Sequence, residues 1–236
     1  MQYYDRVIRG TEREDSLVIV QFLKGMIGKK LSFLNYYKEI PVSYDAKLLS
    51  VENEMAEFEV HDYQAKTISM ERKTLIHRHE TSPVAEDLFA EAFYVNIEKK
   101  RVILCKFGYA KICSDMRRFV RVVLDIPVLA DLATEGDIKT GRVFDMSLGG
   151  AAILLEDIEG LQAGQDINLF LKLPNPGNGS ITEVGLSASV VKILGESAPY
   201  KCIFEFHPEK NSQQQIAYFI NQRQVEIIKE LKDLVV

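Results

Sequence analysis

Alternating apolar and polar side chains dominate the chain, and this pattern predicts a mainly β protein. The clearest case is 56–60, where Ala, Phe and Val alternate with two glutamates, as in a strand with one buried face. Five further runs have strand character: 30–34, 43–51, 73–77, 89–96 and 101–107. The last two flank Glu98-Lys99-Lys100, which predicts a hairpin turn. The first half of the chain is therefore expected to form a small β-barrel.

A short helix is expected near the start of the chain, over residues 15–27. Apolar side chains recur there at three- and four-residue spacing, and Gly28 follows as an expected C-cap. The stretch 18–20 reads Val-Ile-Val, which would also suit a strand, so the pattern leaves that alternative open.

The second half repeats the β pattern. Four sets of alternate residues are expected to face a common core: Val120, Val122, Leu124 and Ile126; Ile167, Leu169, Leu171 and Leu173; Val184, Leu186, Ala188 and Val190; Tyr200, Cys202, Phe204 and Phe206. The run 174–180 is rich in Pro and Gly and must be a loop between two strands. About six strands over this length suit a closed barrel, which leaves no exposed edge.

The chain ends in a predicted helix, over about residues 212–234. Ser212 and Gln215 form a capping-box pattern at its start. Its apolar residues recur at helical spacing: Ile216, Phe219, Ile220, Ile227, Leu231 and Leu234. This face could cover the barrel or join two copies of the chain, and packing on the barrel is favoured.

Length and pattern together predict two domains. A chain of 236 residues suits two domains of roughly 100–130 residues better than one. We assign residues 1–110 to an N-terminal β-barrel and residues 111–236 to a second barrel with the terminal helix. The short mixed segment 108–116 is the expected connector. The expected fold is two small β-barrel domains followed by a C-terminal helix.

Composition and charge narrow the function classes. Apolar residues make up 47% and charged residues 27%, which argues against a disordered or fibrous chain. The net charge of −5 disfavours broad nucleic-acid binding, which needs many Lys and Arg contacts with phosphates. Cys105, Cys113 and Cys202 show no CxxC spacing and are expected to be small buried side chains in a reducing environment. Because no stretch resembles a signal peptide or a membrane span, we expect a cytoplasmic protein.

Two short motifs lie in the second half of the chain. Residues 117–121 read Arg-Arg-Phe-Val-Arg, an RxxxR pattern, and residues 145–150 read Asp-Met-Ser-Leu-Gly-Gly, a DxSxxG pattern. Either motif alone predicts only a solvated charged face or a turn. In this order and among six predicted strands, they resemble the signature of the PilZ family of cyclic di-GMP (c-di-GMP) receptors. The resemblance covers residues from about 116 to 210.

The resemblance implies that arginines of the first motif hold the ligand. Arg117 and Arg121 match the family's arginines, which clasp the nucleotide against the barrel. A guanidinium fork matches the O6 and N7 acceptors of guanine, stacks on purines and pairs with phosphates. Arg118 lies at a variable position, where it would assist a phosphate or point to solvent. Met116, just before the motif, could pack against one ligand molecule and discourage a second, stacked one.

The resemblance also assigns roles to the second motif. Asp145 matches the family's Asp or Asn and would accept hydrogen bonds from the N1–H and exocyclic amine of guanine. Ser147 would bind a phosphate or the edge of the base. Gly150 would allow a close backbone approach to the ligand or a positive φ. Gly149 is given the same role at a variable position of the motif.

These expectations describe a receptor and not an enzyme. The chain has no P-loop, GxSxG or HExxH pattern. His77 and His79 would share one face of a strand, which is compatible with a metal site, but no third ligand is evident and exposed polar positions are favoured. No metal and no cofactor are expected apart from the ligand c-di-GMP.

Residues 1–110 are similar in length, strand content and position to the extra β-barrel of flagellar-brake (YcgR-like) members of the family. This similarity implies an output domain, and ligand held at the junction would reorient the two barrels. The expected receptor relays its message to a protein partner, such as flagellar motor components, in motility or biofilm control. The alternative is a ligand-independent protein–protein adaptor with a vestigial site. No nucleic-acid partner and no membrane span are expected, and either a monomer or a homodimer would fit.

Overall fold

The computed structural model describes residues 3–78, 84–113, 118–134, 137–175 and 179–235. The chain divides into two compact units. The first comprises residues 1–37, 41–117 and 229–236, and the second comprises residues 38–40 and 118–228. Within the described residues, no helix has the length and apolarity needed to cross a membrane.

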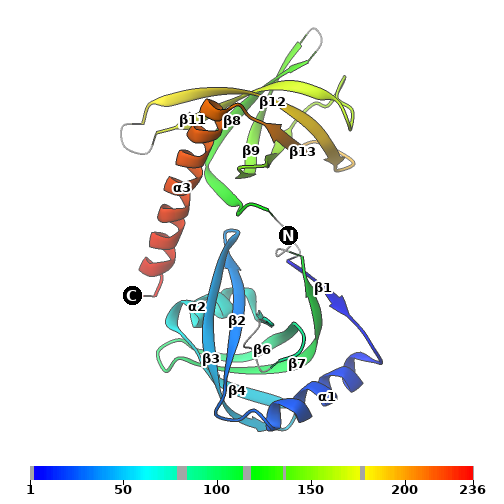
Figure 1. The fold of residues 1–236 in the computed structure, drawn as a ribbon, viewed down its shortest axis with the longest axis vertical. Helices are drawn as coiled ribbons and strands as arrows, with labels where there is room; N and C mark the ends of the chain where they lie inside the picture. Colours follow the sequence, from blue (N-terminus) through cyan, green and yellow to red (C-terminus); the bar gives the residue numbers. More distant parts are fainter. Residues whose placement is uncertain (1–2, 79–83, 114–117, 135–136, 176–178, 236) are drawn as a thin grey trace. The chain divides into compact units, whose positions relative to one another are not determined.

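The first unit is built on a closed ring of strands, as the alternating pattern predicts. Its strands are β1 (Tyr4–Val7), β2 (Lys30–Tyr37), β3 (Ile40–Glu52), β4 (Met55–Glu59), β5 (Lys73–Ile76), β6 (Leu88–Asn96) and β7 (Arg101–Ile112). They pair in the order β1-β7-β4-β3-β2-β5-β6, and a further β6–β7 pairing closes the ring (Figure 1). The predicted hairpin is confirmed, because Asn96 pairs with Arg101. The expected connector is partly wrong, because β7 continues through Ile112.

Helix α1 (Glu12–Lys24) confirms the helical alternative for the first apolar run. It begins earlier than expected because Thr11 and Glu14 form a capping box, in which each side chain accepts a hydrogen bond from the other residue's backbone N–H. It also ends earlier, because Gly25 and not Gly28 is the C-cap. Gly28 has a φ of 85° and lies in the loop that leads to β2.

Helix α2 (Asp62–Glu71) was not expected from the sequence. Half of its buried face is polar, because Gln64 and Thr67 are buried beside Ala65 and Ile68. The side chains of Gln64 and Thr74 both donate to Asn35 Oδ1, at 2.6 and 2.7 Å. A buried helix face that is half polar lacks apolar periodicity, and this explains why the helix cannot be predicted from the apolar pattern.

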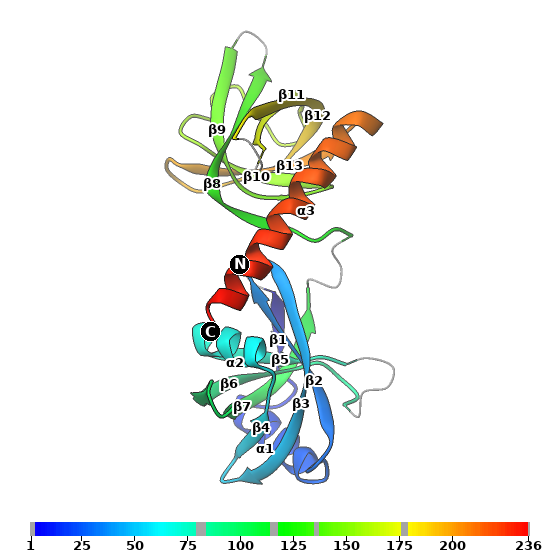
Figure 2. The ribbon, with the colours of Figure 1, turned by 90° about the vertical axis from the view of Figure 1, so that its left-hand side faces the viewer.

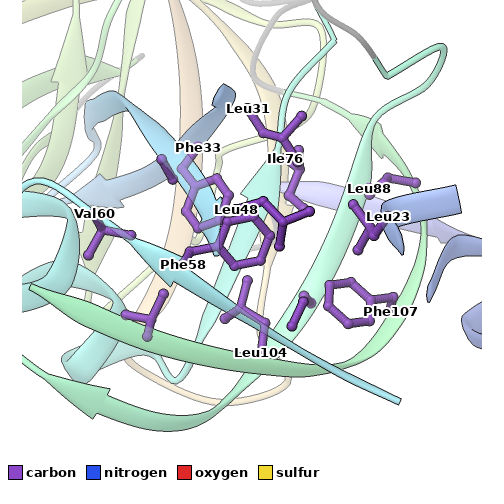
Figure 3. Close-up of a cluster of buried hydrophobic side chains, with 14 of the residues drawn as sticks. Leu23, Leu31, Phe33, Leu48, Phe58, Val60, Ile76, Leu88, Leu104 and Phe107 are labelled. Atoms are coloured by element: carbon purple, nitrogen blue, oxygen red, sulfur yellow. The ribbon is translucent and has the colours of Figure 1, made fainter. Parts of the chain in front are cut away.

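The core of the first unit fills the inside of the ring and is closed by α1 (Figure 3). Phe33 and Phe58 meet edge to face with ring centroids 4.9 Å apart, and both are fully buried. Leu23 brings α1 into the same cluster. Phe58 lies at one of the alternate positions that the strand pattern assigns to a buried face.

The second unit contains a closed barrel of six strands, as predicted. The strands are β8 (Val122–Thr134), β9 (Asp137–Ser147), β10 (Gly150–Leu155), β11 (Asp166–Pro174), β12 (Ile181–Leu194) and β13 (Tyr200–His207). Their order around the barrel is β10-β13-β12-β11-β8-β9 (Figure 1). The faces predicted for β11 and β12 are buried, as are Cys202, Phe204 and Phe206 of β13.

The face predicted for the start of β8 is wrong. Val122 is buried, but Val120 and Ile126 are 44% and 51% exposed. Val120 lies before the strand, and Ile126 lies in a break in the pairing with β9, because the register jumps between Val123 and Val128. Burial resumes at Val128, so alternation does not predict burial within the break.

Helix α3 (Lys210–Asp233) confirms the predicted terminal helix (Figure 2). Ile216, Phe219 and Ile220 are buried, whereas Leu234 lies beyond the helix and is exposed. The predicted capping box is wrong, because Ser212 lies inside the helix and its hydroxyl donates to the carbonyl of Gly185 in β12 at 2.9 Å.

The three cysteines are free thiols. Cys202 is buried in β13, and burial raises its pKa to about 11. The expected burial is wrong for Cys105 and Cys113, which are partly exposed. Cys105 alternates with the inward Leu104 in β7, and Cys113 follows the end of that strand.

Candidate functional site

The second motif forms a tight hairpin between β9 and β10. Ser147 pairs with Gly150 across a turn made of Leu148 and Gly149. The Ser147 hydroxyl donates to the carbonyl of Gly150 at 3.3 Å, so it braces the turn. Strand geometry therefore presents the motif at one end of the barrel wall.

Glycine at position 150 is required by the neighbouring strand. A Cβ atom there would lie 2.2 Å from the backbone carbonyl oxygen of Phe204 in β13. The predicted alternative of a positive φ at Gly150 is wrong, because this glycine is an extended strand residue. The close approach that this glycine permits is thus made to β13.

Gly149 brings the two motifs together. A Cβ atom at Gly149 would lie 3.0 Å from Cδ2 of Phe119, which belongs to the RxxxR segment. The Gly149 carbonyl also accepts from the backbone N–H of Phe206 at 3.0 Å. The turn is therefore packed against the arginine segment on one side and tied to β13 on the other.

Asp145 occupies an irregular point of the barrel. It pairs with Ala152 while Val143 pairs with Ile153, so Phe144 is an extra residue opposite β10. The register of β8 breaks opposite the same residue. A bulge of this kind redirects the side chains around it, and bulges are frequent next to functional sites.

The carboxylate of Asp145 lies between two cations. The side chain is 1% exposed. Arg121 Nη1 is 3.8 Å from Oδ1, and Lys201 Nζ is 3.6 Å from Oδ2. Both distances exceed a normal hydrogen bond, and Oδ2 accepts no hydrogen bond from any residue that the structure describes. A buried carboxylate with a vacant acceptor position is costly, and it suits a ligand that brings N–H donors.

Burial and neighbouring charges act on Asp145 in opposite directions. Burial raises the pKa of the carboxyl group above its ordinary value of 3.8. The positive charges of Lys201 and then Arg121 oppose this rise, while the negative charge of Glu39 adds to it. Both cations therefore favour the ionised carboxylate, the form with the most acceptor positions.

The arginines of the first motif are described only in part. Arg121 comes directly before β8 and is the one that reaches Asp145. Arg118 is exposed, with its guanidinium carbon 5.2 Å from the ring centroid of Phe119. Arg117 and Met116 lie outside the described residues, so their predicted roles stay predictions.

Lys201 was missed by sequence reasoning. It lies in β13, more than fifty positions from the DxSxxG motif, and its ammonium is 4.0 Å from the ring centroid of Phe144. It is partly exposed and comes directly before the buried Cys202 in β13. Only the strand order places Lys201 near Asp145, because β13 and β9 both pair with β10.

The possible metal site has no support in the part of the chain that the structure describes. His77 Nδ1 lies 3.0 Å from Asp87 Oδ1, and His79 is outside the described residues. No group of three or more His, Cys, Asp or Glu side chains that could hold a metal ion occurs among the described residues.

Comparisons with known proteins give one family match and several similar solved structures. A model of the PilZ domain family matches residues 115–222. No curated protein matches. Among solved structures, the Bacillus subtilis inhibitor of motility MotI/DgrA is 16% identical with a TM-score of 0.44, over 85% of this chain and 97% of that chain. YcgR of Escherichia coli in complex with c-di-GMP is 12% identical with a TM-score of 0.43, over 98% and 97%. The K. pneumonia MrkH–c-di-GMP complex is 14% identical with a TM-score of 0.39, over 97% and 99%.

Proposed function

Because residues 115–222 match the model of the PilZ domain family, we propose that this chain is a receptor for c-di-GMP. The observation that carries the proposal is the buried carboxylate of Asp145, which lies beside the cations Arg121 and Lys201 and whose Oδ2 accepts no hydrogen bond from a described residue. Guanine presents N–H donors on one edge beside the acceptor O6, and c-di-GMP adds two phosphates. A site with one carboxylate and several cations matches both parts of this ligand.

Each motif residue has a proposed part in binding. Asp145 accepts from the N1–H and the exocyclic amine of guanine. Arg121, together with Arg117, holds guanine or phosphate through bidentate hydrogen bonds, and Arg118 assists a phosphate. The proposed site also includes Ser147, Gly149 and Gly150. In this proposal the Ser147 hydroxyl binds a phosphate or the edge of the base, while the two glycines let the hairpin pack closely against Phe119 and β13.

The proposed role is signal relay without a chemical reaction. In this proposal residues 1–110 form the output domain, and binding changes the angle between the two barrels. A protein partner, such as a flagellar motor component, then reads the change and alters motility or biofilm formation. The proposal needs no cofactor besides the nucleotide.

Isothermal titration of the purified chain with c-di-GMP tests the proposal, with GTP as the control nucleotide. We expect saturable binding with an affinity near micromolar or tighter, about −8 kcal/mol, and no saturable binding of GTP. The stoichiometry from the same titration gives the number of ligand molecules per chain. Absence of binding at high ligand concentration would make the motif vestigial and favour a ligand-independent protein adaptor.

A further inference from the structure

Lys201 is placed to act on the ligand and belongs to neither motif. Its side chain is 26% exposed, and its ammonium lies 3.6 Å from Asp145 Oδ2 and 4.0 Å from the ring centroid of Phe144. An ammonium over an aromatic face is attracted by the ring, so Phe144 helps to hold the charge beside the carboxylate. The ammonium has three N–H donors and can serve Asp145 and a ligand atom together.

The order of groups on guanine matches the order of these side chains. The Watson–Crick edge of guanine presents O6, N1–H and the exocyclic amine side by side, which is acceptor, donor, donor. Asp145 provides two adjacent acceptors, with Lys201 on the Oδ2 side and Arg121 on the Oδ1 side. When Oδ2 accepts from N1–H, the neighbouring O6 comes within reach of the Lys201 ammonium. Lys201 then provides a donor for O6, and the two oxygens of Asp145 provide acceptors for N1–H and the amine.

We propose that Lys201 is a specificity-determining residue of this site, which donates a hydrogen bond to guanine O6 while Asp145 accepts from the other two groups of the same edge. This inference rests on the proposed function as a c-di-GMP receptor. Adenine has a donor in place of O6 and an acceptor in place of N1–H. It therefore meets a donor at Lys201 and an acceptor at Asp145, which is a mismatch at both positions.

Binding measurements with three cyclic dinucleotides test this role. We compare c-di-GMP, c-di-IMP, which keeps O6 and N1–H but lacks the amine, and c-di-AMP. A charged hydrogen bond is worth about 1.5–3 kcal/mol, so K201M is expected to bind c-di-GMP roughly ten- to a hundredfold more weakly. The loss for c-di-IMP should be the same factor, because both ligands keep O6. The affinity for c-di-AMP should not fall.

Two variants serve as matched controls. K201R keeps a positive donor at the site and should restore most of the affinity. K192M removes an exposed lysine from β12 of the same barrel and should bind like the wild type. Circular dichroism and chemical denaturation of each variant establish that the barrel is folded.

Two results would overturn the role of Lys201 while leaving the receptor intact. One is that the wild-type chain binds c-di-GMP and the affinity of K201M is within roughly threefold of the wild-type affinity. The other is a loss for c-di-GMP that is absent for c-di-IMP or that disappears in alkaline buffer. A loss absent for c-di-IMP would mean that Lys201 does not act through O6. A loss that disappears in alkaline buffer would mean that Lys201 only keeps Asp145 ionised against its burial and the nearby Glu39. Failure of the wild-type chain to bind any of the three ligands would overturn both proposals.

A measurement on the wild-type chain keeps the proposal testable if K201M does not fold. Reductive methylation with ¹³C labels lysine amines and retains their charge. The Lys201 signal, assigned by its absence in K201R, should shift on saturation with c-di-GMP. An unshifted Lys201 signal in a chain that binds the ligand would contradict direct contact.

Discussion

At the scale of single residues, Asp145 combines burial with two adjacent positive charges. Burial raises the pKa of the Asp145 carboxyl group in the folded chain above its ordinary value of 3.8. The protonated group therefore contributes to folding stability below pH 3.8, and this contribution is lost as the pH rises through the folded pKa. Ligand binding has the opposite requirement, since a protonated carboxyl group loses an acceptor position. Stability and binding therefore favour opposite protonation states of one side chain.

The pH dependence of binding follows from this conflict. The affinity for c-di-GMP is expected to fall as the buffer is acidified from neutrality toward pH 3.8, with the decline beginning above that value because the folded pKa is raised. Titration calorimetry at several pH values measures it. D145N, which cannot ionise but keeps one carbonyl acceptor, should bind with an affinity that changes little over the same range. An equal decline in D145N would assign the effect to another group.

Arg121 is the second residue whose loss should be measurable. R121A removes charged hydrogen bonds worth about 1.5–3 kcal/mol each, so c-di-GMP binding should weaken roughly ten- to a hundredfold or more. The exposed Arg142 of β9 offers a control, because R142A removes the same charge from the same barrel. Unchanged affinity in R121A would move the site elsewhere.

At the scale of elements, the buried face of a strand can be predicted from the sequence where the strand is paired without interruption. The prediction fails where the pairing is interrupted. The faces of β11 and β12 are correct because alternation holds along each strand. The start of β8 is not, because its ladder with β9 breaks between Val123 and Val128. Lys201 reaches Asp145 only through that irregular geometry and the pairing of distant strands. A local motif therefore identifies Asp145, while the surroundings of Asp145 depend on long-range pairing.

The broken part of β8 is held by α3. Arg223 is 5% exposed and donates to the Val123 carbonyl at 3.4 Å, to Asp125 Oδ2 at 2.7 Å and to Glu226 Oε2 at 3.0 Å. R223A is expected to lower the free energy of unfolding by about 1.5–3 kcal/mol, because charged hydrogen bonds are lost. Urea denaturation measures it. R142A, an exposed arginine, should change the value by less than about 0.5 kcal/mol.

The β9–β10 hairpin gives a second stability prediction. G150A places a Cβ atom 2.2 Å from the Phe204 carbonyl oxygen, so β10 and β13 must separate, which should cost about 1–3 kcal/mol. G185A in β12 meets only the Phe170 side chain at 3.3 Å and should be milder. If urea denaturation gives the same loss for both variants, the close strand approach is not the cause.

At the scale of the whole molecule, the proposed relay requires a change in the distribution of interatomic distances. Small-angle scattering of the chain with and without saturating c-di-GMP should give different profiles, because binding is expected to reorient the two barrels. The R121A variant at the same ligand concentration provides the reference for unbound chain. Superimposable profiles at full occupancy would remove domain reorientation from the mechanism.

Asp145 Oδ2, which accepts no hydrogen bond from a described residue, also suggests a way to identify ligands. An unsatisfied buried polar atom costs roughly 1–3 kcal/mol, and a nucleotide that supplies the missing donor recovers that energy only in the folded chain. Its binding should therefore raise the melting temperature in proportion to how well it fills this position. A thermal-shift screen of nucleotides would then rank candidate messengers directly, and a guanine-containing cyclic dinucleotide should head the ranking.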